Sequence, residues 1–214
     1  MLLDHVSYVA SHDQISDVVN RIGSQIGTAF IDGGIHPKFG TRNFTAPLLN
    51  GQYIEVVCPL DHPATDSTPF GQAVKKKAEA GGGWLTWVFS STELSKVEEK
   101  FGRKAADGYR TRPDGSELKW KQIGVKEIFG AGELPFFIQW LTDNHPSKDG
   151  NSVAKITKIV IADDEKLADS WFQDEIQSGL KDVEIEWVKP EANEGDKGIV
   201  TVQLTTPTGV VKLS

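Results

Sequence analysis

Sulfur-containing residues are nearly absent from this chain of 214 residues, which holds one cysteine and one methionine. Because Cys58 has no second cysteine to pair with, an intramolecular disulfide is excluded, and a reducing compartment, the cytoplasm, is the expected location. The thiol is interpreted as a small strand residue rather than a nucleophile, since the nearest histidine, His62, stands beyond a proline.

Long apolar runs and an excess of positive charge are also missing. No stretch approaches the roughly 20 apolar residues that a membrane-spanning helix needs. The first five residues lack the basic and long apolar regions of a secretory signal. Lys and Arg number 23 against 30 Asp and Glu, for a net charge of −7. A nucleic acid or an anionic membrane requires a basic surface, so neither is an expected partner.

Local signature motifs are absent as well. The chain contains no GxGxxG, no P-loop, no CxxC pair and no HExxH. Nothing local therefore indicates a Rossmann-type or phosphate-binding nucleotide site. Apolar residues make up 38% and charged residues 25% of the chain, which is ordinary for a globular protein.

Three segments share one pattern, a β-rich stretch of alternating character followed by apolar residues at helical spacing. They span residues 3–23, 82–102 and 155–176. A polar cluster suited to a helix N-cap stands between the two parts of each segment. The helix positions of the first two segments match at one constant offset along the chain: Ile15, Val18 and Ile22 with Leu94, Val97 and Phe101. A constant offset through a helix indicates a repeated unit.

A later strand is repeated too. Its first three residues match at a slightly longer offset: Tyr53, Ile54 and Glu55 with Phe137, Ile138 and Gln139. The sequence therefore predicts an α+β fold of three βαβββ units, at about 2–62, 82–146 and 153–214. The first two units form one domain, 1–150, and a third βαβββ-like unit forms another, 151–214. An α+β sandwich of unrelated strands is the alternative.

Four strings stand in a fixed order along the chain: GGIHPKFGTRNFTAPL (33–48), YIEVVCP (53–59), RTRPDGSELKW (110–120) and LPFFIQW (134–140). Together with the repeat, they resemble the glyoxalase-like domain family, common in bacteria, of the vicinal-oxygen-chelate superfamily. The resemblance covers about residues 2–160. It implies two paired units whose curved sheets enclose a small-molecule cavity, the largest of the molecule, with helices outside.

In metal-dependent members of this superfamily, such as glyoxalase I, ligands come from the first and last strands of each unit. The resemblance places His5 and Glu55 at these positions in the first unit, and Trp84 and Gln139 in the second. Here the chain departs from the pattern, because tryptophan does not ligate metals and neutral glutamine is a weak ligand.

His5 and Glu55 are the main candidate pair. If both face one cavity, they can act as an acid–base pair or bind a divalent metal. The alternative is a buried His–Glu hydrogen bond that only joins two strands. His36, which follows Gly33 and Gly34, completes a set of two histidines and one carboxylate that suits zinc, iron or nickel. A structural loop histidine is the alternative for His36.

Five further residues are candidates for ligand binding. Asn43 can orient a carbonyl group or be a satisfied strand residue. Arg110 and Arg112 share strand parity and can bind a carboxylate or phosphate, or lie solvated on a hairpin. Trp84 and Gln139 are expected to line the cavity opposite His5.

Two functions from different classes follow from these residues. The first is a lyase or isomerase that acts on a small carbonyl or hydroxy compound with Glu55 as the base. The second is a protein that binds, senses or sequesters a small molecule in the same cavity without turnover. The third unit is expected to form a homodimer through an exposed sheet face, or to fold back onto the first two.

Overall fold

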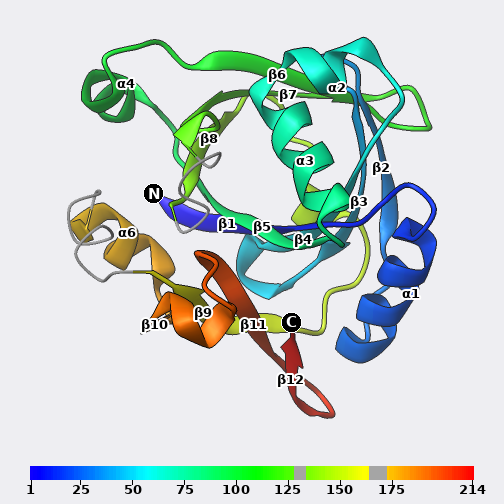
Figure 1. The fold of residues 1–214 in the computed structure, drawn as a ribbon, viewed down its shortest axis with the longest axis vertical. Helices are drawn as coiled ribbons and strands as arrows, with labels where there is room; N and C mark the ends of the chain where they lie inside the picture. The colour runs from blue at the N-terminus through cyan, green and yellow to red at the C-terminus, as the bar shows by residue number, and fades with distance from the viewer. Residues whose placement is uncertain (128–133, 164–172) are drawn as a thin grey trace.

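Eight strands close into a barrel-like sheet in the computed structural model, which describes residues 1–127, 134–163 and 173–214, without the side chains of 173–175 (Figure 1). Their order around the sheet is β1-β4-β3-β2-β6-β7-β8-β5. The first unit supplies four of these strands, and one helix follows the first of them. The elements of this unit are β1 (Leu2–Val9), α1 (Ile15–Ile26), β2 (Ile31–His36), β3 (Thr41–Pro47) and β4 (Tyr53–Pro59).

The second unit repeats this arrangement. Its elements are β5 (Gly83–Ser90), α4 (Ser95–Phe101), β6 (Ala106–Thr111), β7 (Glu117–Ile123) and β8 (Phe136–Trp140). In both units the first strand pairs in parallel with the last, β1 with β4 and β5 with β8. The two halves join through an antiparallel β1–β5 pair and through β2 and β6. The expected pair of βαβββ units around one enclosed space is confirmed.

Two helices connect the units, α2 (Pro63–Ser67) and α3 (Pro69–Glu79). In Figure 1, α3 lies across the space that the strands surround, and it contacts β1, β4 and β5. Its first turn starts with Pro69, and the Thr68 hydroxyl accepts a hydrogen bond from the backbone N–H of Gly71, a typical N-cap. Phe70 and Val74 are buried on the side that faces the strands.

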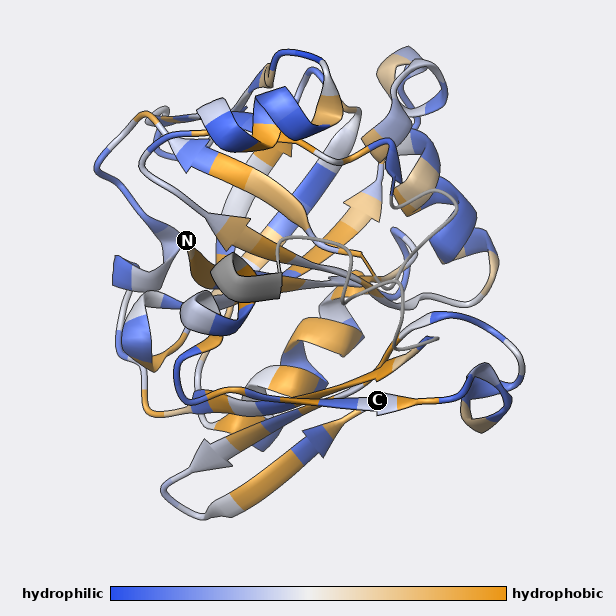
Figure 2. Ribbon diagram, turned by 90° about the vertical axis from the view of Figure 1, so that its left-hand side faces the viewer, coloured by the Kyte–Doolittle hydropathy of each residue, from blue (hydrophilic) through white to orange (hydrophobic). Residues whose placement is uncertain are grey.

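The last part of the chain forms a separate four-stranded sheet, drawn as its own layer in Figure 2. Its elements are β9 (Lys155–Ala162), α6 (Gln173–Leu180), β10 (Glu184–Val188), β11 (Gly198–Thr206) and β12 (Gly209–Leu213). The strand order is β10-β9-β11-β12, so the first strand lies between the second and third. In each of the first two units, the first strand pairs with the fourth strand of the same unit. A third unit with the same strand arrangement is therefore not confirmed. Residues 164–172 of its predicted strand–helix segment lie outside the described residues.

The apolar face of this C-terminal sheet packs on the barrel-like sheet. Ile156, Ile159, Val202 and Leu204 belong to one buried cluster with Leu3 and other residues of the first unit. The apolar face is therefore covered within one chain, as in the alternative in which the third segment folds back. In the part of the chain that the structure describes, this packing buries the apolar face on which the homodimer prediction was based.

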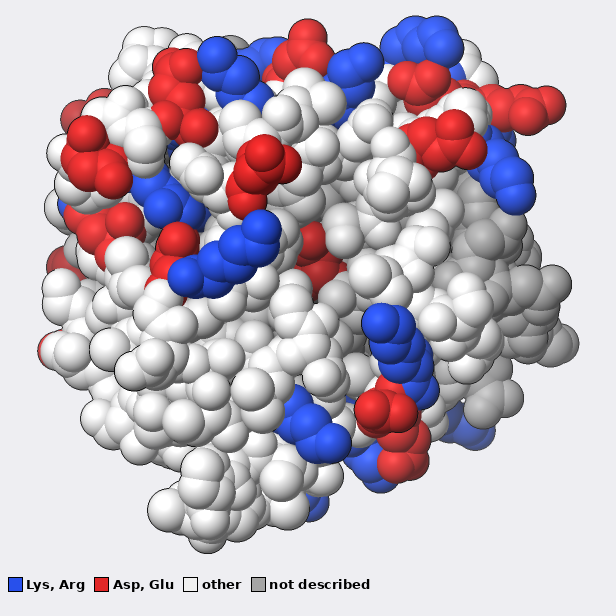
Figure 3. Space-filling view, turned by 180° about the vertical axis from the view of Figure 1, so that it is seen from behind, with Lys and Arg blue, Asp and Glu red and all other residues white. Residues whose placement is uncertain are grey.

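In Figure 3 positive and negative side chains lie next to one another, mainly along the upper part of the face, and the coloured residues form no continuous basic surface. Among the described residues, no helix is both long and apolar enough to cross a membrane. Cys58 lies buried in β4, and burial raises the pKa of its thiol to about 11. A thiol with this pKa is protonated at neutral pH, in keeping with its interpretation as a strand residue.

Candidate functional site

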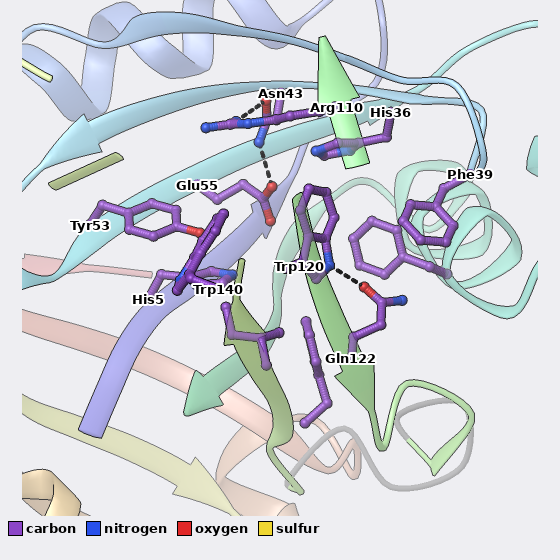
Figure 4. Close-up of a pocket in the computed structure, with 13 residues that line it drawn as sticks. His5, His36, Phe39, Asn43, Tyr53, Glu55, Arg110, Trp120, Gln122 and Trp140 are labelled. Carbon is purple, nitrogen blue, oxygen red and sulfur yellow. Dashed lines mark hydrogen bonds between the residues drawn. The ribbon is translucent and has the colours of Figure 1, made fainter. Parts of the chain in front are cut away.

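A cavity of about 40 Å³ lies between the first and second units (Figure 4). It has room for about three water molecules, at roughly 10–15 Å³ each. Every strand of the barrel-like sheet except β5 contributes a lining residue, and α3 adds one: the lining comprises His5, His36, Phe39, Asn43, Tyr53, Glu55, Phe70, Arg110, Trp120, Gln122, Phe136, Ile138 and Trp140. The expectation of a cavity shared by the two units is confirmed.

This cavity is not the largest by volume, contrary to the sequence-based expectation. A surface groove of about 370 Å³ lies beside Asp61 and Lys75, and one of about 340 Å³ lies beside Asn20 and Ala29. Both are wider and more open to solvent. The smaller cavity nevertheless brings together the buried side chains of Glu55 and Arg110 with two buried histidines, and it is the candidate site.

Glu55 is the central acid of the cavity, and only 5% of its surface is exposed. The Ser7 hydroxyl donates to its Oε2 at 2.6 Å, and the Asn43 amide donates to its Oε1 at 2.6 Å. Burial by itself would raise the pKa of the Glu55 carboxyl. The positive charge that His5 and His36 carry when protonated, and then the two hydrogen bonds, lower the pKa overall, so the group is ionised at neutral pH.

Arg110 extends this network from the second unit. Its Nη1 donates to Oδ1 of Asn43 at 2.6 Å, so the amide links the guanidinium to Glu55. Only 2% of Arg110 is exposed, and its Nε and Nη2 have no hydrogen-bond partner among the described residues. Burial lowers its pKa, but a guanidinium stays protonated in proteins. Unpaired buried donors are costly, which favours a functional role over a purely structural one.

Two glycines permit this arrangement. A Cβ on Gly33 would lie 2.2 Å from both Nη1 of Arg110 and Oδ1 of Asn43. At Gly34, whose φ is +90°, it would lie 1.9 Å from the backbone oxygen of Thr111. The absence of a side chain at these two positions therefore admits the arginine and a neighbouring strand.

His36 faces the cavity from β2, and its Nδ1 lies 2.9 Å from the Thr41 hydroxyl. Burial, with lesser effects of Arg110 and His5, lowers its pKa to about 4, although Glu55 opposes the shift. The imidazole is therefore neutral at neutral pH. The side chain of His36 lines the cavity, and His36 is the last residue of strand β2. It is therefore not a histidine of a structural loop.

His5 faces the cavity from β1, and its partner is a residue that was not among the candidates from the sequence. Its Nδ1 lies 2.7 Å from Oδ1 of Asp4, and no hydrogen bond joins it to Glu55 among the described residues. Strict strand alternation would turn Asp4 to the opposite face. A bulge in the β1–β5 pairing between Leu3 and His5 breaks that alternation.

Aromatic rings form most of the remaining wall. Trp120 and Trp140 pack on each other with centroids 5.7 Å apart, and Trp120 packs edge-on to His36, also at 5.7 Å. Phe39 and Phe70 lie on the other side of His36. The walls are thus apolar, and the polar groups converge at one end, as in many small-molecule sites.

Three of the eight candidate residues do not line the cavity. Trp84 donates its indole N–H to the backbone oxygen of Leu213, 3.1 Å away in the C-terminal sheet. Gln139 donates its amide to the backbone oxygen of Thr92 at 2.6 Å. Arg112 follows the end of β6 and forms a bidentate ion pair with Asp149.

Strand register explains two of these corrections. His5 pairs with Tyr53 in the first unit, whereas Val88 pairs with Phe136 in the second. The structural counterpart of His5 is therefore Val88, and that of Glu55 is Ile138. The sequence alignment was displaced by one residue on β8, and such a slip exchanges the two faces of a strand. Arg112 was misplaced because β6 ends at Thr111.

The family model of the glyoxalase-like domain matches residues 3–175, well over half of the chain. The chain belongs to this family. The resemblance noted in the sequence, to the glyoxalase-like domain family of the vicinal-oxygen-chelate superfamily, is thereby confirmed. A search among curated proteins gave no significant match.

The comparison with solved structures gave a match over nearly the whole chain and others over part of it. A crystal structure of a hypothetical protein from Staphylococcus aureus covers 99% of this chain and 98% of its own, at 15% identity and a TM-score of 0.62. Methylmalonyl-CoA epimerase from Mycobacterium tuberculosis covers 64% of this chain and 86% of its own, at 16% identity and a TM-score of 0.44. At such identities the likeness concerns the fold alone.

Divalent metals are common in this superfamily, and the expected ligands were His5, His36 and Glu55. All three line the cavity. Among the described residues, however, no three histidine, cysteine or acidic side chains are grouped closely enough to hold a metal ion. Both oxygens of Glu55 already accept hydrogen bonds, and the Arg110 cation stands at the same end. This arrangement does not fit a metal.

Proposed function

We propose that this glyoxalase-like protein is a lyase or isomerase that moves a proton next to the carbonyl group of a small compound, with Glu55 as the base. One observation carries the proposal: an ionised carboxylate and a guanidinium with unpaired N–H groups are buried in one small cavity. A carboxylate is a common base for such protons, and a nearby cation stabilises the enolate that forms.

The apolar walls support this role. The lining is largely apolar and Arg110 is buried, so the electrostatic effect of Arg110 on a developing oxyanion is stronger than in solvent. Ser7 and Asn43 hold the Glu55 carboxylate in one orientation. Asn43 thus acts on the base, whereas the sequence offered two alternatives, the orientation of a carbonyl group or a satisfied strand residue.

The second candidate function is binding without turnover. One observation favours it: both Glu55 oxygens accept hydrogen bonds and the pKa of the carboxyl is lowered, so Glu55 is a weak base. In that case the cavity sequesters or senses a small molecule. The cytoplasmic location and the homodimer stay predictions, the latter to be tested by light scattering against the chain mass of 23.5 kDa.

Solvent-deuterium exchange separates the two candidates. Small hydroxy and oxo compounds are incubated with the protein in D₂O, and loss of the carbon-bound proton is followed by NMR. We expect exchange with the wild type, and a loss of about 10²- to 10⁴-fold in Glu55→Gln. Glu79→Gln, which removes an exposed carboxylate of α3, is the matched control and keeps the rate. Compounds that bind but never exchange would instead establish binding without turnover.

A further inference from the structure

We infer that Asp4 is a positioning residue that holds His5 as a second proton acceptor in the cavity, and that the substrate class is therefore an α-hydroxycarbonyl compound. The reaction assigned to His5 rests on the proposed function. The orientation of His5 does not, and it can be tested without turnover.

Asp4 receives hydrogen bonds from three rings. Its Oδ1 lies 2.7 Å from Nδ1 of His5, and its Oδ2 lies 3.1 Å from both Nε1 of Trp140 and Nε2 of His145. An indole N–H only donates. Nδ1 of His145 accepts from the backbone N–H of Ser147, so its Nε2 carries the proton that points to Asp4.

These contacts determine the tautomer of His5. Only 2% of Asp4 is exposed. Burial by itself would raise its pKa, but the hydrogen bonds with His145 and His5 hold it well below the ordinary value, so Asp4 is a carboxylate. A carboxylate only accepts hydrogen bonds, and Nδ1 of His5 must therefore be the donor. In the neutral imidazole the lone pair is therefore left on Nε2.

The His5 ring is also held in place by stacking. It lies on Tyr53 with centroids 4.3 Å apart and an interplanar angle of 19°, and Phe136 meets it edge-on. Nε2 of His5 has no hydrogen-bond partner among the described residues, and the side chain lines the cavity beside Trp140 in Figure 4. An oriented imidazole with a free lone pair can accept a proton from a compound bound in the cavity.

Two acceptors in one cavity suit a substrate that gives up two protons. In an α-hydroxycarbonyl compound, Glu55 takes the carbon-bound proton, and the electron pair of that bond enters an enediolate. Nε2 of His5 takes the proton of the neighbouring hydroxyl and delivers it to the former carbonyl oxygen. Glu55 then returns its proton to the former carbonyl carbon. The product is the isomeric hydroxycarbonyl compound, and no oxidant or reductant is needed.

Asp4→Asn has a specific expected effect. The position of Oδ2 faces two N–H donors, from Trp140 and His145. The amide oxygen of the asparagine must occupy that position, which turns its NH₂ group towards His5. Nδ1 of His5 must then accept, and the ring proton moves to Nε2. The acceptor that faces the cavity is lost without any change in the size of the side chain.

The test is the ¹⁵N spectrum of the full-length protein labelled at its five histidines, with His5 assigned through a His5→Gln variant. We expect the wild type to carry the ring proton of His5 on Nδ1 and D4N to carry it on Nε2. His145→Ala removes one donor to Asp4 but leaves the Asp4–His5 bond, so it keeps the wild-type tautomer. In the exchange assay, D4N lowers kcat by about 10²-fold or more with little change in KM.

A wild-type His5 with its proton on Nε2 would overturn the inference, and this result does not depend on whether D4N folds. A folded D4N that keeps the proton on Nδ1 would overturn it as well. If no compound of any class exchanges while His5 has the expected tautomer, the proposed function fails and the positioning role of Asp4 stands.

Discussion

His36 is a buried imidazole that stays neutral when a histidine in water would gain a proton. Its pKa is about 4 in the folded protein, against about 6.5 in an unfolded chain. Between these values the unfolded chain binds a proton that the folded protein does not. The free energy of unfolding should therefore fall as the pH drops from about 6.5 towards about 4, by up to ~1.4 kcal/mol per pH unit.

Urea unfolding at pH 7, 6 and 5 measures this slope. His36→Gln is expected to flatten it, because glutamine does not titrate. His12→Gln is the matched control, since His12 is exposed, and it should keep the wild-type slope. A slope that is unchanged in H36Q would contradict the assignment of the pH dependence to His36.

Residue-level prediction from the sequence succeeded where a polar residue interrupts an apolar strand. Five candidates from the sequence line the cavity: His5, His36, Asn43, Glu55 and Arg110. Asp4 was missed for a physical reason, since alternation along a regular strand places neighbouring side chains on opposite faces. A β-bulge is set by the partner strand and leaves no mark in the local pattern.

At the scale of elements, β8 shows how much depends on register. The repeat located this strand correctly along the chain, but the one-residue displacement put Gln139, instead of Ile138 and Trp140, on the cavity side. Internal similarity did not settle the register, because insertions between strands change the offset. Pairing with β5 and β7 settles it in the folded chain.

The register assignment predicts opposite sensitivities at neighbouring positions of β8. Ile138→Ala removes buried methyl groups beside the cavity, and it should lower the free energy of unfolding by about 2–5 kcal/mol. Gln139→Ala should change it by no more than about 0.5 kcal/mol, because Gln139 lies towards the surface. Both values come from urea unfolding curves. The reverse order would support the sequence-based register and contradict the structure.

At the scale of the whole molecule, the C-terminal sheet is part of the core. The element order of this segment resembles a third repeat, but its strand order differs, and its apolar face packs on the first unit. The sequence indicated apolar strands that need covering. It did not indicate whether another chain or the same chain covers them, since both arrangements bury the same side chains.

Leu204 and Val210 test this packing as a pair. Leu204 is fully buried between the two sheets, whereas Val210 is 61% exposed. Leu204→Ala should lower the free energy of unfolding of the whole chain by about 2–5 kcal/mol in one cooperative transition. Val210→Ala should change it by no more than about 0.5 kcal/mol. A transition for the C-terminal sheet separate from that of the barrel-like sheet would show an independent domain instead.

The central claim is that the cavity between the first two units is the site of this protein, and the indole N–H signals of the six tryptophans test it most directly. A compound that exchanges deuterium or binds is titrated into ¹⁵N-labelled protein. The signals of Trp120 and Trp140, which line the cavity, should shift with a common saturation curve. The indole N–H of Trp84 is hydrogen-bonded to the backbone oxygen of Leu213, and its chemical shift should not change. A shift of Trp84 with no change at Trp120 and Trp140 would place the site elsewhere and contradict the account.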